Sequence, residues 1–143
     1  MPSTPWLRAF PVLFVDDEPD NLLVLRATFS RRFDVLTAPN AEAALALLAV
    51  HPVAMMVTDQ RMPGMTGIEL CAEVRQRWPE VRRVVLTAWG DREATLSAIN
   101  EGGVHAFFDK PWKVPPLEKI LGEAVTAAAL ADRQAQLSTA LLE

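Results

Sequence analysis

Apolar residues occur along the chain in five short runs, and between these runs they return every three or four positions among polar residues. The runs are rich in Val, Leu and Phe and show little alternation, which is typical of strands covered on both faces of a sheet. Strands are therefore predicted at residues 12–16, 33–37, 53–58, 83–87 and 104–108.

The stretches between the strands carry the spacing and the end signals of helices. Strands and helices that alternate with short connections predict an α/β fold, with a parallel sheet, right-handed crossovers and helices on both faces. In chain order, the end signals are Pro19 just inside the first helix, Asn40 as a cap for the second at 41–50, a Thr66–Glu69 capping box for the third, and Asp91 and Gly102–Gly103 at the two ends of the fourth.

The last helix is expected to be longer than the sheet. An Ala-rich helical pattern runs from about residue 115 to 142, and about 27 residues at ~1.5 Å each make about 40 Å of helix. Its first half can pack on the sheet, whereas its second half carries Leu130, Leu137 and Leu141 on one stripe between polar residues. An isolated overhang is marginal in water, so we expect it to pair with a second copy, to continue into a further domain or to fray.

These patterns divide the chain into an N-terminal extension at 1–10, one folded domain at 11–125 and a helical extension or connector at 126–143. After residue 125 the sequence shows no helix-turn-helix, catalytic HD motif or nucleotide-binding glycine loop, so no output function is recognised. A stand-alone domain has little use for a helix that outruns its sheet, and we therefore expect a piece of a larger protein, cut within a connecting helix.

Composition narrows the class of protein. At 143 residues, with half of them hydrophobic and a net charge of −4, the chain is an ordinary globular domain without the positive charge that nucleic acid or an anionic membrane would attract. Cys71 is the single cysteine, which excludes an intrachain disulfide and favours a reducing compartment. Neither a secretory signal nor a membrane-spanning apolar stretch is recognisable, so a cytoplasmic location is expected.

Three carboxylates stand at the ends of two predicted strands. Asp59 follows an apolar run that a turn ends, and Asp16 and Asp17 follow another. Open α/β sheets place their chemistry at the carboxyl ends of their strands, so the three side chains are expected to meet. They would repel one another unless a cation or a phosphoryl group belongs to the site, and this predicts a metal-dependent phosphoryl acceptor.

Four blocks, in order, resemble the receiver domain of two-component response regulators over roughly residues 10–125. The family's fold is a flavodoxin-like, doubly wound, five-stranded parallel sheet, (βα)5, here with an extended C-terminal helix. The stretch 58–67, with 98–103 and 110–112, is most similar to receivers of HD-GYP-type phosphodiesterases or of hydrogenase-type transcriptional regulators. The four blocks are Val12–Pro19, Asp59 with Met62–Gly67, Thr87–Ala88 and Lys110–Pro111.

The residue types suit a phosphorylation site. Asp59 would be the nucleophile that forms an acyl phosphate, and Asp16 and Asp17 would hold Mg²⁺ or Mn²⁺. Lys110 and Thr87 would supply a positive charge and a hydroxyl to phosphoryl oxygens. The resemblance implies that Asp17 is the direct ligand, that Asp16 acts through water, and that the backbone carbonyl of Arg61 completes the protein ligands. It also implies a cis Lys110–Pro111 peptide.

The resemblance implies a switch in which Thr87 moves toward the phosphate and an aromatic side chain three residues before Lys110 rotates. That position is Phe107, which lacks a hydroxyl, so packing must bias the two states. Simple core packing is the alternative for Phe107. Trp89 and Trp112 near the same rim are a candidate partner surface, and the alternative is that they cover loop backbone.

Other residues are expected to be structural. Cys71 is predicted to lie in the core, and His51 and His105 lack the neighbours of a metal or phosphodonor site, with His105 inside the fifth strand. Arg82 and Arg83 are predicted to be solvated at the start of a strand.

The expected function is that of a receiver: a histidine kinase or phosphotransfer protein phosphorylates Asp59, and this changes affinity for an output domain, for a partner or for a second copy through the C-terminal helix. Enzymatic activity is limited to self-phosphorylation and autodephosphorylation. A degenerate receiver that serves as a dimerisation scaffold is one alternative. The other is an Asp-nucleophile phosphohydrolase, which Arg61 disfavours because such enzymes need a second acid–base Asp two residues after the nucleophile.

Overall fold

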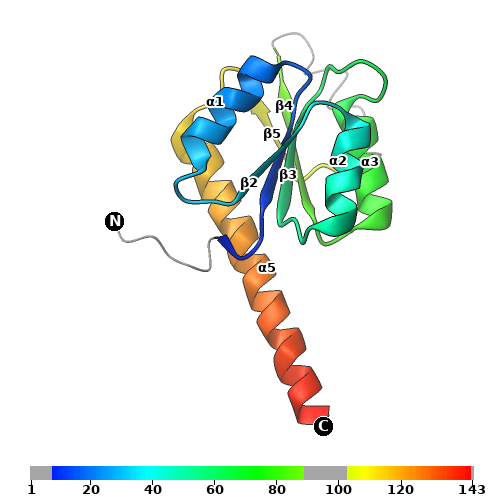
Figure 1. Ribbon diagram of the computed structural model, residues 1–143, viewed down its shortest axis with the longest axis vertical. Helices are drawn as coiled ribbons and strands as arrows, with labels where there is room; N and C mark the ends of the chain where they lie inside the picture. Colours follow the sequence, from blue (N-terminus) through cyan, green and yellow to red (C-terminus); the bar gives the residue numbers. More distant parts are fainter. Residues whose placement is uncertain (1–7, 89–102, 143) are drawn as a thin grey trace.

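A computed structural model describes residues 8–88 and 103–142 of the chain. These residues contain a parallel sheet of five strands in the order β2-β1-β3-β4-β5 (Figure 1). Helices α1 and α5 cover one face of this sheet, and α2 and α3 cover the other. The predicted flavodoxin-like fold is therefore confirmed. The elements are β1 (Val12–Val15), α1 (Pro19–Phe29), β2 (Val35–Ala38), α2 (Ala41–Val50), β3 (Met55–Asp59), α3 (Gly67–Arg77), β4 (Arg82–Thr87), β5 (Ala106–Asp109) and α5 (Val114–Leu142).

Several predicted strand ends are shifted, because apolar runs mark burial rather than pairing. Phe33 is buried but lies in the turn after α1, where its N–H donates to the carbonyl of Phe29, so β2 begins only at Val35. Val53 and Ala54 are likewise buried ahead of β3. The fifth strand begins at Ala106 rather than at residue 104, and His105 therefore lies just before it.

The helix end signals have the expected geometry where the structure describes them. The Asn40 side chain accepts a hydrogen bond from the N–H of Ala43 at 2.8 Å, and Thr66 and Glu69 form the reciprocal capping box of α3. Pro19 is the first residue of α1. The helix expected between Asp91 and residue 102 lies outside the described residues.

Helix α5 divides into a packed part and an extension that leaves the sheet (Figure 1). Leu117 and Leu121 are fully buried, whereas Leu130, Leu137 and Leu141 are 58%, 55% and 88% exposed. The long helix predicted from the Ala-rich pattern is therefore present. Within the described residues, its extension leaves a leucine stripe facing solvent. None of the described helices is both long and apolar enough to cross a membrane.

Arg83 is a correction to the expected solvated strand start. Its side chain is buried at the beginning of β4, and burial lowers the pKa of its guanidinium. The guanidinium donates hydrogen bonds to the carbonyls of Gly103 at 2.8 Å, Val81 at 2.7 Å and Pro79 at 3.3 Å. A buried Arg is tolerated here because backbone oxygens satisfy it.

Acidification is expected to weaken the start of the β4–β5 pair at His105. Its Nδ1 accepts the N–H of Arg83 at 3.0 Å, and only an unprotonated Nδ1 can accept. His105 is exposed as a whole, but partial desolvation of its ring lowers its pKa, and the charges of Arg83 and Arg82 lower it further. A lowered folded-state pKa means that the contribution to stability is present above the unfolded value of about 6.5 and is lost as the pH falls toward the folded value.

Urea unfolding measures this loss. Between about pH 7.5 and about pH 5.5, the wild type should lose more stability than His105→Gln, which cannot titrate. Equal losses in the two proteins would show that His105 does not carry the effect.

Candidate functional site

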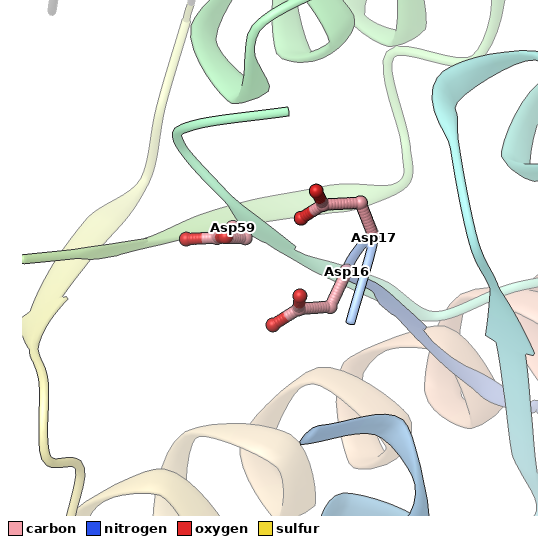
Figure 2. Close-up of side chains that lie close together, drawn as sticks. All are labelled: Asp16, Asp17 and Asp59. Carbon is pink, nitrogen blue, oxygen red and sulfur yellow. The ribbon is translucent and has the colours of Figure 1, made fainter. Parts of the chain in front are cut away.

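Three carboxylates meet at the carboxyl edge of the sheet. Asp16 and Asp17 follow β1 directly, and Asp59 is the last residue of β3. Because β1 and β3 are parallel neighbours, with Val15 paired to Thr58, their ends lie side by side. One carboxylate oxygen from each aspartate lies within 4.8 Å of the others (Figure 2). Strand pairing thus brings the predicted acidic cluster to one edge of the sheet.

The environment of Asp16 disfavours its negative charge. Its side chain is 2% exposed, and its pKa is raised by burial and also by the nearby charge of Asp59. Two donors oppose this shift: the N–H of Glu18 at 2.9 Å and the side-chain amide of Asn21 at 3.1 Å. The carboxylate therefore keeps its place through bonds from the start of α1.

Lys110 supplies the positive charge that the cluster needs. Its Nζ lies 2.7 Å from Oδ1 of Asp59, while its backbone N–H donates to the carbonyl of Thr87 at 2.8 Å. The Lys110–Pro111 peptide is cis, as the resemblance implies. The lysine thus reaches from the end of β5 across β4 to the end of β3.

Thr87 and Phe107 come from the two strands between Asp59 and the edge of the sheet. Thr87 ends β4, is 2% exposed, and lies with its Oγ1 3.5 Å from a carboxylate oxygen of Asp109. Phe107 is half-buried and packs against the core layer of α2 and α3. Both side chains are on elements that meet at the site.

Trp112, one of the two tryptophans proposed for a partner surface, packs partly against the core. Trp112 is half-buried, and its ring centroid lies 5.6 Å from that of Phe29 on α1, so part of its surface is used in the core. Trp89 lies outside the described residues. A partner surface at Trp112 therefore stays a prediction, restricted to the exposed part of its ring.

Asn21 and Gln60 contact the acidic residues but are not predicted from the sequence to do so. Asn21 donates to Asp16, and the N–H of Gln60 donates to Oδ1 of Asp59 at 2.9 Å. The available signal is polar identity: each stands close in sequence to an aspartate of the cluster. Polar residues are too common at such positions for this signal to select them.

The donor set fits a hard divalent cation. Mg²⁺ prefers carboxylate, carbonyl and water oxygens, and the site offers three carboxylates of which Asp17 is exposed. Lys110 offsets one negative charge of the cluster. The negative charge that remains can be neutralised by a bound cation. The arrangement can therefore bind a metal and place an anionic group against Asp59.

Comparison with known proteins identifies the family to which the chain belongs. The family described as response regulator receiver domain matches residues 12–122. The hydrogenase transcriptional regulatory protein HoxA of Cupriavidus necator is 43% identical over 119 residues, covering 83% of this chain and 25% of HoxA. The response regulator protein PilR of Pseudomonas aeruginosa is 32% identical over 114 residues, covering 79% of this chain and 25% of PilR. This chain thus spans about a quarter of these relatives.

A solved structure extends the comparison to the fold. The signal receiver domain of an HD domain-containing protein from Pseudomonas fluorescens Pf-5 superposes with a TM-score of 0.77 at 30% identity, covering 84% of this chain and 98% of that one. The likeness predicted from the motifs, to receivers of hydrogenase-type regulators and of HD-type proteins, is confirmed.

Proposed function

The chain belongs to the response regulator receiver domain family, and we propose that Asp59 is its phosphoacceptor. The observation that carries this proposal is the position of the Asp59 carboxylate, between the Asp16–Asp17 pair and the ammonium of Lys110, 2.7 Å away. A nucleophilic carboxylate needs a nearby positive charge to admit an anionic phosphoryl group, and this neighbourhood supplies it.

The carboxylates of Asp16, Asp17 and Asp59, with the backbone carbonyl of Arg61, would hold Mg²⁺ or Mn²⁺. The ion, when bound, neutralises the carboxylates and the phosphoryl oxygens. The residues themselves position the reacting groups. Asn21 and the N–H of Glu18 keep the carboxylate of Asp16 in place.

The transfer is a displacement at phosphorus. A carboxylate oxygen of Asp59 forms the new P–O bond while the P–N bond of a phosphohistidine breaks, and the imidazole nitrogen keeps the electron pair and takes a proton. Lys110 then pairs with a phosphoryl oxygen, and the hydroxyl of Thr87 donates to another. Phe107 would follow Thr87 by repacking, because it has no hydroxyl of its own. Water later cleaves the acyl phosphate to restore Asp59 and inorganic phosphate.

Incubation with a small phosphodonor such as acetyl phosphate, with and without Mg²⁺, tests this proposal. We expect one phosphoryl group per chain, dependent on Mg²⁺, sensitive to hydroxylamine as an acyl phosphate is, and mapped by mass spectrometry to the peptide that contains Asp59. A stable phosphoryl group on another residue would contradict the assignment.

The relatives support a proposal for the partners. Receiver domains act with histidine kinases and output domains, and the matched regulators are about four times as long as the region they share with this chain. We propose that a histidine kinase or a phosphotransfer protein phosphorylates Asp59, and that α5 connects the receiver to an output region. The phosphorylation state of Asp59 would then affect the output region through α5.

The exposed stripe on α5 supports self-association. Leu130, Leu137 and Leu141 recur at intervals of seven and four residues, which is the spacing of a helix-pairing seam. Leu137→Glu is expected to weaken the dimer at least tenfold, or about 1.4 kcal/mol, because it places a charge in that seam. Light scattering across a concentration series measures the change. Ala135→Glu adds the same charge on the opposite face of the helix, because two residues turn the helix by about 200°, and it should leave the dimer intact; equal weakening by both would argue against this seam.

A further inference from the structure

Gln60, the residue after Asp59, joins three elements at the site. Its backbone N–H lies 2.9 Å from Oδ1 of Asp59 and 3.2 Å from the carbonyl of Leu86 on β4. Its backbone carbonyl accepts the N–H of Gly67 at 3.0 Å, and its side-chain Oε1 accepts the N–H of Ile68 at 2.9 Å. One residue therefore connects the phosphoacceptor, the neighbouring strand and the start of α3.

The first four N–H groups of a helix have no partner within the helix. In α3, the Thr66–Glu69 capping box satisfies two of them: the hydroxyl of Thr66 accepts the N–H of Glu69 at 3.2 Å, and the carboxylate of Glu69 accepts that of Thr66 at 3.1 Å. Gln60 satisfies the other two, at Gly67 and Ile68. The helix start is thus attached half to its own cap and half to the residue beside Asp59.

The contact between the strand end and the helix start is too close for a side chain. A Cβ added at Gly67 would overlap the backbone carbonyl oxygen of Asp59 and would lie 3.0 Å from Cα of Gln60. Residues 61–66 consequently form a loop whose two ends are held together by the contacts of Gln60 with Gly67 and Ile68. Gly64, inside this loop, has a φ of 83°. The carbonyl of Arg61 belongs to this loop, so its position depends on how firmly the loop is closed.

We propose that Gln60 is a positioning residue: its side-chain amide holds the 61–66 loop closed and so sets the Arg61 carbonyl for the metal. This inference rests on the proposed function, in which that carbonyl is a ligand. Thr66 supports the same helix through Glu69 but has no bond of its own to Asp59 or Gln60 among those described. A comparison of variants at Gln60 and Thr66 therefore separates the effect of helix capping from the effect of metal positioning.

Matched variants of the full 143-residue chain test the inference. Gln60→Met keeps the length of the side chain and removes the acceptor of the Ile68 N–H, whereas Thr66→Val keeps the shape and removes the acceptor of the Glu69 N–H. Each should lower the melting temperature by a similar amount, about 3 to 5 °C. Calorimetric titration with MgCl₂ should show binding weakened roughly 3- to 10-fold in Gln60→Met and less than about 2-fold in Thr66→Val.

Gln60→Glu is a third variant, which keeps an acceptor for the Ile68 N–H. We expect it to melt as the wild type does and to bind Mg²⁺ at least as tightly. The inference is overturned if wild type binds Mg²⁺ while Gln60→Met binds equally well, if Thr66→Val weakens binding as much, or if Gln60→Glu is weakened like a variant that lacks the acceptor. A wild type that binds no Mg²⁺ overturns the proposed function itself, and this inference with it.

Discussion

Asp59→Asn is expected to lower phosphorylation by acetyl phosphate by roughly 10³-fold or more, because the amide that replaces the carboxylate is not a nucleophile. The substitution preserves the shape of the side chain and an oxygen that can face Lys110, 2.7 Å away in the wild type. It also removes one of three neighbouring negative charges. The folded protein should therefore persist without loss of stability while its chemistry disappears.

Incorporation of phosphate is measured by intact mass, and folding is checked by urea unfolding of the same sample. Asp34→Asn is the matched control, since Asp34 is exposed just before β2, outside the acidic cluster. This control should be phosphorylated like the wild type. Phosphorylation of Asp59→Asn at the wild-type level would move the nucleophile to another residue, and loss of activity in both variants would point to a general effect of charge.

Phe29→Ala should cost about 3 to 5 kcal/mol of unfolding free energy, the range for removing a large aromatic side chain from a packed core. Phe29 is 1% exposed, and its ring lies 5.6 Å from the rings of both Phe14 and Trp112. It therefore joins α1 to β1 and to the turn that follows Lys110–Pro111. A cavity there removes contacts from three parts of the protein at once.

Urea unfolding followed by far-UV circular dichroism measures this free energy. Leu23→Ala, on the same helix at 68% exposure, removes a smaller apolar side chain from the surface and should change stability by no more than about 0.5 kcal/mol. The difference between the two variants isolates burial from helix propensity. A cost below about 1 kcal/mol for Phe29→Ala would contradict the packing of α1 on the sheet.

The site was predictable to the extent that it consists of strand ends. Asp16, Asp17, Asp59, Thr87 and Lys110 each follow or end an apolar run, and parallel pairing brings such ends to one edge. The strand boundaries were less predictable, because Phe33 and Val53 are as apolar and as buried as true strand residues but pair with no neighbouring strand. In a single sequence, a buried residue outside a strand gives the same apolar pattern as a buried residue that is paired within one.

Arg83 is the opposite case, a charged residue that is buried. A charged residue beside Arg82 at the start of a strand is indistinguishable in sequence from a solvated one, yet it is buried among carbonyls contributed by residues before and after β4. Gln60 is similar, because its partner Ile68 lies eight residues away across a turn. Bonds of this kind depend on the path of the backbone, which residue types do not specify.

The sequence by itself determined the order of strands and helices, the helix caps at Asn40 and Thr66, and the residues that carry charge to the sheet edge. It could do so because hydrophobic periodicity and capping are local, so each is encoded within a few positions. Only the tertiary structure decided the ion pair of Lys110 with Asp59, the attachment of α3 through Gln60 and the exposure of the leucine stripe on α5. Those features are distances between segments, and such distances are set by how the segments pack together.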